Sequence, residues 1–143
     1  MKTTLLIATG VAALVTATHL RDTAALRAAD TTGQVYELRT YHTPPGKLTA
    51  LHARFRDHSI KLFERHGMKV VGFWVPTDAS QGSADTLVYI LAHKSRAAAD
   101  ASWAAFSADP EWVRVKAESE KDGSLTSKVD KVFMSATDYS PMK

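Results

Sequence analysis

Two kinds of hydrophobic repeat follow one another along this chain from residue 34 onward. Residues 34–41, QVYELRTY, alternate along the chain and are rich in β-branched and aromatic side chains, which is typical of a strand. Residues 47–66 place apolar side chains every three or four positions, which predicts a helix that ends at Gly67. The stripe along this helix consists of Leu48, Leu51, Phe55, His58 and Leu62.

Three further strands and a second helical region complete the pattern. Strands are expected at residues 68–75, 85–93 and 128–136. The continuous apolar run of 85–93 predicts a central strand that is covered on both faces. Between residues 95 and 122, Ser95 and Asp109 are expected to cap two successive helical segments. The order βαββαβ predicts an α+β fold, the ferredoxin-like plait, in which both helices cover one face of a four-stranded antiparallel sheet.

The strands carry large apolar residues on both faces. Neighbouring large side chains occur at Phe73–Trp74, Val88–Tyr89 and Phe133–Met134. Side chains alternate along a strand, so one member of each pair must point away from the helices. A second copy of the same sheet would cover such a patch by two-fold symmetry. We therefore expect a homodimer built sheet against sheet, with a cavity between the sheets.

Residues 1–25 have the pattern of a secretory signal peptide. Lys2 precedes an apolar stretch at residues 5–17, and small residues at 15–17 or 23–25 offer a cleavage site. At 1.5 Å per residue this stretch spans roughly 20 Å, short of the ~30 Å hydrocarbon core. An uncleaved signal anchor and an organelle presequence are the alternatives. We expect export to the periplasm or medium without a stable membrane span after cleavage.

The remaining boundaries and the charge follow from this division. Residues 26–33 form an expected linker, and residues 34–143 form the folded domain. The formal net charge is +3, of which the first 29 residues supply +2, through three cationic side chains against Asp22. The domain is therefore nearly neutral and has no cluster of Lys and Arg, so nucleic acid is not an expected partner.

The chain contains no cysteine. This excludes disulfide scaffolds, zinc ribbons, iron–sulfur sites and thiol nucleophiles. No histidine spacing matches a known metal motif, so we expect no metal and no other cofactor.

The first strand carries the candidate binding residues. Its alternation places Glu37, Arg39 and Tyr41 on one face. In a cavity between two sheets, Arg39 could hold an anionic or carbonyl group in a bidentate manner. The alternative is structural: Glu37 and Arg39 pair across strands with Asp130 or Lys131 and fix the sheet register.

The aromatic residues of the strands and of the helices are interpreted differently. Trp74, Tyr89 and Phe133 are either packing in the dimer core or walls of an apolar pocket. Three aromatic residues of the second helical region lie at core spacing and are interpreted as structural: Trp103, Phe106 and Trp112.

Three histidines suggest chemistry. His58 lies in the helical stripe, where it is either a general base or a core histidine bonded to a strand backbone or carboxylate. His42 and His93 lie at strand ends, where a haem or metal ligand is conceivable.

Four motifs together resemble the NIPSNAP family, which belongs to the dimeric α/β-barrel superfamily. They are YELRTY at 36–41, HGMKVVGFW at 66–74, WAAFSADPEW at 103–112 and DYSPMK at 138–143. The resemblance implies the plait and its pairing as a dimeric α/β barrel, but no particular reaction. Superfamily relatives include cofactor-independent monooxygenases and haem-dependent enzymes. Animal members are mitochondrial and are linked to mitophagy; because this leader is secretory, those roles are not carried over.

We therefore expect an exported homodimer that binds a small apolar or anionic ligand through Glu37, Arg39, Tyr41, Trp74 and Tyr89. The first alternative is a cofactor-independent monooxygenase-type enzyme, with His58 or Arg39 as catalytic residue. The second is a haem-handling protein that uses His42 or His93, and the third is an interaction module.

Overall fold

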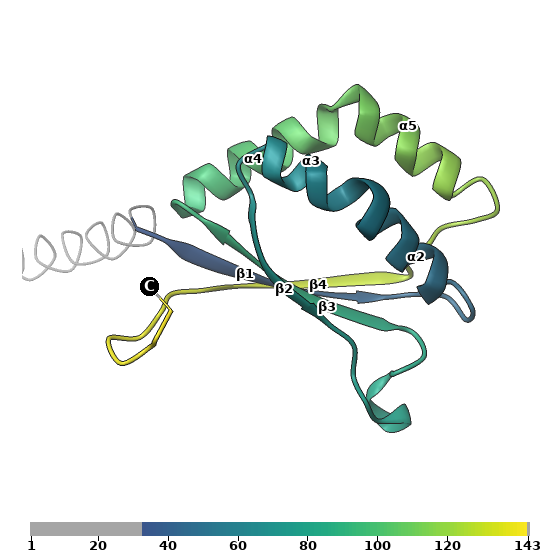
Figure 1. Cartoon of the computed structure of the whole chain (residues 1–143), viewed down its shortest axis with the longest axis horizontal. Helices are drawn as coiled ribbons and strands as arrows, with labels where there is room; N and C mark the ends of the chain where they lie inside the picture. Colours follow the sequence, from purple (N-terminus) through teal and green to yellow (C-terminus); the bar gives the residue numbers. More distant parts are fainter. Residues whose placement is uncertain (1–32, 143) are drawn as a thin grey trace, which may run out of the picture.

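The computed structural model describes residues 33–142, and these form the expected plait (Figure 1). The predictions of a signal peptide at 1–25 and of a linker at 26–33 fall outside this part, apart from Gly33. The strands are β1 (Val35–His42), β2 (Lys69–Trp74), β3 (Thr86–His93) and β4 (Lys128–Met134). The helices are α2 (Leu48–Arg54), η1 (Phe55–Ser59), α3 (Ile60–Arg65), η2 (Ala79–Gln81), α4 (Arg96–Ala108) and α5 (Pro110–Ser119).

The four strands form one antiparallel sheet in the order β2-β3-β1-β4. In its register Arg39 of β1 lies between Tyr89 of β3 and Lys131 of β4. Paired residues point to the same face of a sheet. The register therefore decides which side chains of different strands can share a site.

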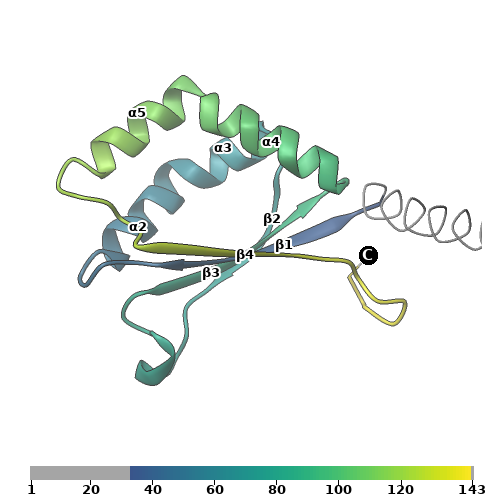
Figure 2. The same cartoon turned by 180° about the vertical axis from the view of Figure 1, so that it is seen from behind.

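All the long helices lie on one side of the sheet (Figures 1 and 2). The β2–β3 connection and the C-terminal tail, residues 135–142, lie on the other side, which we call the open face. This arrangement confirms the predicted βαββαβ order and the one-sided covering of the sheet.

The first helix contains a π-helical turn that the apolar spacing did not predict. In η1 the amide N–H of Ile60 donates to the carbonyl of Phe55, five residues earlier. This wider turn buries Ser59, which is 1% exposed, in the place that a regular helix would give to His58. The predicted stripe therefore holds for Leu51, Phe55 and Leu62 but is wrong for His58, which is only half-buried.

The helix ends follow the local chemistry of their sequences. Ser95 accepts a 3.1 Å hydrogen bond from the amide of Ala98, and Asp109 accepts one of 2.8 Å from the amide of Glu111. Gly67 has φ 75°, a conformation that favours glycine after a helix. The expected caps at Ser95 and Asp109 are confirmed.

The core lies between the helices and the sheet and is rich in aromatic rings. Tyr89 is fully buried, and its ring stacks on Phe63 at a centroid distance of 6.0 Å. Phe106 of α4 lies 5.1 Å from the same Phe63 ring. Tyr89 and Phe133 both point toward the helices, so neither belongs to the open face on which a second copy was expected to pack.

The open face carries apolar side chains on all four strands. Trp74 and Val132 are 50% and 53% exposed, and Leu38, Val88 and Ile90 are half-buried. The prediction that residues 85–93 are covered on both faces is therefore wrong for the open face of β3. At one end, hollows between the C-terminal tail and the sheet are lined by Tyr36, Ile90 and Met142. Within residues 33–142 no helix is long and apolar enough to cross a membrane.

Candidate functional site

The polar face of β1 points beneath the helices. Glu37 is 1% exposed and the side chain of Arg39 is 13% exposed, and both share their face with the buried Tyr89. The expected position of Glu37, Arg39 and Tyr41, in a cavity between two sheets, is therefore wrong. They lie between the sheet and the helices of a single chain.

Glu37 is the centre of a buried polar cluster. Its Oε2 accepts a 2.6 Å hydrogen bond from the indole Nε1 of Trp103 on α4 and lies 3.0 Å from Nε2 of His93 on β3. Its Oε1 lies 3.3 Å from Nε of Arg39. An ionised carboxylate only accepts hydrogen bonds, so His93 carries its proton on Nε2. The carboxylate thus joins two strands and a helix.

The cluster keeps Glu37 ionised. Burial alone would raise the pKa of this carboxyl, but the hydrogen bonds from His93 and Trp103 and the charge of Arg39 outweigh it. The pKa of Glu37 is therefore lower than its ordinary value. A buried carboxylate with this many donors is a fixed negative charge that holds Arg39 in place.

Arg39 is stacked between aromatic groups. Its guanidinium carbon lies 3.8 Å from the centroid of the Trp103 ring and 5.8 Å from that of Tyr41. Burial raises the pKa of the Tyr89 hydroxyl well above its ordinary value, so this neighbour of Arg39 is a neutral phenol. Glu37 and Arg39 therefore take part in a structural network, but not with the expected ion-pair partners. Glu37 contacts His93, and Trp103 contacts both Glu37 and Arg39. Asp130 pairs instead with Lys128 and His42.

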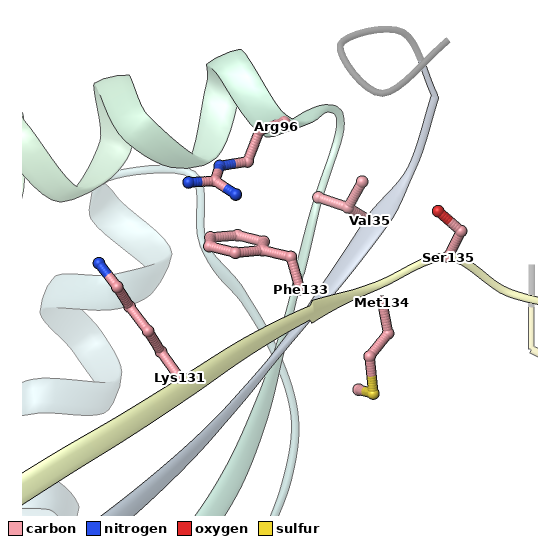
Figure 3. A pocket seen from close by; sticks show the side chains of 6 residues that line it. All are labelled: Val35, Arg96, Lys131, Phe133, Met134 and Ser135. Atoms are coloured by element: carbon pink, nitrogen blue, oxygen red, sulfur yellow. The ribbon is translucent and has the colours of Figure 1, made fainter. Parts of the chain in front are cut away.

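A cleft of about 400 Å³ opens beside this cluster, between the start of α4 and strand β4 (Figure 3). We call it the outer cleft. Its lining consists of Val35, Arg96, Lys131, Phe133, Met134 and Ser135. In Figure 3 the side chains of Lys131 and Phe133 rise from β4 toward α4, while Met134 points to the opposite face.

The local sequence explains why the outer cleft exists. β4 is an edge strand, and its helix-facing residues Val129 and Lys131 are exposed because the helices lie mainly over the other strands. Arg96 is the first residue of α4, directly after the Ser95 cap, so the helix start points its side chain over β4. Its guanidinium carbon lies 3.8 Å from the Phe133 ring centroid.

The outer cleft is positively charged. Within residues 33–142 no carboxylate forms an ion pair with Lys131, and Arg96 reaches only Asp100, at 3.4 Å on the surface. Exposed pairs of this kind are weak and are screened by solvent. Two cations therefore face the cleft with little compensation.

Phe133 separates the outer cleft from the buried cluster. It is the register partner of Glu37, and its ring centroid lies 6.3 Å from that of His93. Lys131 is likewise the register partner of Arg39. The buried cluster thus fixes the part of β1 that pairs with Phe133 and Lys131.

A second and more enclosed hollow of about 160 Å³ lies farther along the same face of β4. We call it the inner hollow. It is lined by Tyr41, Arg54, Phe55, Ser59, Phe63, Phe106, Trp112, Lys116, Thr126 and Val129. Arg39 and its register partner Lys131 lie between Phe133 of the outer cleft and Val129 of the inner hollow.

The other residues named from the sequence are dispersed. Trp74 lies on the open face, and Tyr89 lies in the core. His58 lies in a groove between η1 and α5 beside Arg114, so it does not share a cavity with Arg39. Its role as a core histidine bonded to a strand is also wrong, since this groove lies among helices.

The two strand-end histidines lie at opposite ends of the sheet, because His42 ends β1 beside the first residue of β3 and His93 ends β3. His42 contacts Asp130 at 3.3 Å on the open face, next to Thr86, whereas His93 is buried with Glu37. In the described part of the chain, no three His, Asp or Glu side chains are grouped so that they could hold a metal ion. The two histidines therefore do not converge on one site.

Three residues of the site escaped the sequence patterns. Trp103 was assigned to core packing, His93 was considered only as a haem or metal ligand, and Arg96 was given no role. Lys131 was named from the sequence as a cross-strand neighbour of Glu37 and Arg39, and it is the register partner of Arg39. The Trp103 contact depends on the helix position, which strand pairing does not predict.

The family assignment follows from a match to the NIPSNAP family model over residues 36–141. The chain belongs to the NIPSNAP family. The four motifs that resembled this family lie within or overlap the matched segment, so the resemblance is confirmed. No curated protein matches this NIPSNAP chain significantly.

Solved structures share the fold of this NIPSNAP protein. A NIPSNAP family protein of unknown function from Agrobacterium tumefaciens, Atu4242, has a TM-score of 0.66 at 24% identity, over 78% of this chain and 95% of its own. An uncharacterised NIPSNAP-like domain protein from Burkholderia xenovorans has a TM-score of 0.65 at 16% identity, over 76% and 89%. These likenesses show the fold.

A similar chain fold occurs in SnoaB, a cofactor-independent oxygenase from Streptomyces nogalater. Its TM-score is 0.50 at 13% identity, over 77% of this chain and 99% of SnoaB. At this identity the likeness shows the fold alone, and it transfers no reaction to the NIPSNAP chain.

Proposed function

We propose that this NIPSNAP protein binds a small molecule with an anionic group and an apolar body in the outer cleft. The observation that carries this proposal is the pair of cations, Arg96 and Lys131, beside Phe133 in a cleft of about 400 Å³. Volumes of this order are typical of small-molecule sites. The anion would contact the two cations, and the apolar body would lie on the Phe133 ring.

Binding, rather than catalysis, is the function that this lining supports. Its six residues include no carboxylate and no imidazole, which are the most common general bases. Glu37 is ionised, but it lies behind Phe133; its Oε2 is hydrogen-bonded to Trp103 and His93, and its Oε1 is paired with the charge of Arg39. These contacts support a positioning role for Glu37.

A pair of probes with the same shape tests the requirement for charge. We expect 2-naphthoate to bind at least about tenfold more tightly than neutral 2-acetylnaphthalene, because a charge-assisted contact contributes more than a neutral one. Isothermal titration calorimetry measures both affinities. Equal affinities, or no binding of naphthoate at millimolar concentration, would contradict the proposal.

We also propose that the protein works as a homodimer paired through the open face. The apolar side chains of that face, with Trp74 and Val132 half exposed, support this pairing because such patches on soluble proteins usually mark interfaces. In this arrangement the outer cleft remains on the helix side of each chain, so each subunit keeps its own site.

Finally, we propose that the chain is exported. The support is the leader pattern at residues 1–25, with Lys2 before an apolar stretch and small residues after it. Intact-mass measurement on protein from the periplasm or medium tests this, and we expect a mass lacking the leader. Full-length protein in the membrane fraction would favour the anchor instead.

A further inference from the structure

We infer that the inner hollow is a second binding site, for an uncharged single-ring aromatic molecule that carries a hydrogen-bond acceptor such as a ketone or aldehyde oxygen. This inference goes beyond the proposed function, because it concerns a different cavity with different lining residues. It depends on three features of the hollow: its size, its aromatic walls and one buried donor.

The size and the walls fit one aromatic ring. The hollow measures about 160 Å³, and a cavity of roughly 150 Å³ lined by apolar side chains accepts benzene. Phe106 and Trp112 form one wall, with ring centroids 4.4 Å apart, and Phe55 and Tyr41 form another at 5.7 Å. Rings arranged in this way offer both faces and edges for contact with the ring of a bound aromatic molecule.

The buried donor is the side chain of Arg54. This residue lines the hollow and is only 5% exposed, and its Nε has no hydrogen-bond partner within residues 33–142. A buried N–H group without a partner is costly, so an acceptor on a bound molecule would stabilise the protein there. The π-helical turn at 55–59 begins directly after Arg54 and buries Ser59 in the same lining.

The charge of Arg54 is already balanced, which selects an uncharged ligand. Its Nη1 lies 2.8 Å from Oε1 of Glu120 and 3.4 Å from Oγ of Ser119. The Nε–H therefore belongs to a guanidinium whose charge is already paired with Glu120, so a neutral oxygen satisfies it without adding a buried charge. Lys116 also lines the hollow, but its side chain is exposed.

Fluorine NMR with 4-fluoroacetophenone and fluorobenzene tests both halves of the inference on the full mature protein. We expect the ketone to bind about tenfold more tightly than fluorobenzene, since it gains one hydrogen bond. Absence of binding by the ketone, or equal affinity of the two probes, would overturn the inference. Tighter binding of 4-fluorobenzoate than of the ketone in the Lys131→Glu variant, in which the outer cleft has lost a cation, would overturn the choice of an uncharged ligand.

Two variants locate the binding. Val129→Phe should fill the hollow from β4 and weaken ketone binding at least about tenfold, whereas Val132→Phe, on the opposite face of the same strand, should leave it unchanged. Arg54→Lys keeps a cation for Glu120 but removes Nε, so it should lower the ketone affinity to that of fluorobenzene. Unchanged ketone binding in Val129→Phe would place the ligand elsewhere and overturn the inference, even if Arg54→Lys failed to fold. Naphthoate binding in the outer cleft is measured separately, so each proposal can fail alone.

Discussion

The indole nitrogen of Trp103 donates a 2.6 Å hydrogen bond to a carboxylate oxygen of the buried Glu37. This contact ties helix α4 to strand β1 and also lays the indole ring over the guanidinium of Arg39, at 3.8 Å. Arg96 is the first residue of α4, so the same contact also sets the distance between the Arg96 side chain and β4. The buried cluster and the outer cleft are thus parts of one arrangement.

Trp103→Phe should destabilise the protein by about 1.5–3 kcal/mol, because it removes a hydrogen bond to a buried charged group. The phenyl ring keeps most of the packing against Phe63, so the lost donor dominates the effect. Urea denaturation measures the change in the free energy of unfolding.

Trp74→Phe is the matched control for this substitution. Trp74 lies on the open face and has no part in the buried cluster, and a phenyl ring keeps an apolar contact there, so we expect a smaller change in the free energy of unfolding than for Trp103→Phe. Equal effects of the two substitutions on the free energy of unfolding would mean that the Trp103–Glu37 hydrogen bond adds no measurable stability.

The stability that ionised Glu37 contributes should depend on pH in one direction. Its pKa in the folded protein is below the ordinary value of 4.5, so the contribution is complete above about that pH and is lost as the pH falls through the folded pKa. Glu37→Gln is neutral at every pH and provides the reference. We expect the stability advantage of the native protein over this variant to stay constant from pH 7 to about pH 5 and to shrink at lower pH.

Denaturant titrations of both proteins at a series of pH values measure that difference. A difference that grows as the pH falls would mean that the pKa of Glu37 is raised, as expected for a carboxyl dominated by burial. Such a result would contradict the role of Glu37 as a fixed anion that holds Arg39.

Val132→Glu should separate the proposed dimer without unfolding the chain. Val132 is 53% exposed on the open face of β4, and a carboxylate there would be buried against the second copy. Light scattering should give twice the mass of the mature chain for the native protein and a single mass for the variant. Val113→Glu, at a position 55% exposed on α5, is the control and should remain dimeric. A monomeric native protein at micromolar concentration would remove the basis for pairing.

The fold could be predicted from the sequence because its signals are local and repeated. Alternation at 34–41, the Ser95 and Asp109 caps and the glycine at residue 67 each specify a local conformation without help from the rest of the chain. The π-helical turn could not be predicted, because its five residues have no special composition, and it moved His58 out of the stripe.

The candidate site could be predicted only in part. The polar alternation of Glu37 and Arg39 identified the right strand, but not which face the helices would cover. Both faces of the sheet carry large apolar residues, so hydrophobicity alone did not distinguish them. Position relative to α4, which decides the contacts of Trp103 and Arg96, is a tertiary property with no local signature.

The affinity of 2-naphthoate for two charge-reversal variants of β4 tests the central claim most directly. Lys131 lines the outer cleft, whereas Lys128 points to the open face and pairs with Asp130 at 2.8 Å. Both substitutions, Lys131→Glu and Lys128→Glu, make the same change in net charge on the same strand. We predict that calorimetry will show at least about tenfold weaker binding for Lys131→Glu and nearly unchanged binding for Lys128→Glu. Equal losses, or a loss confined to Lys128→Glu, would contradict a binding site between α4 and β4.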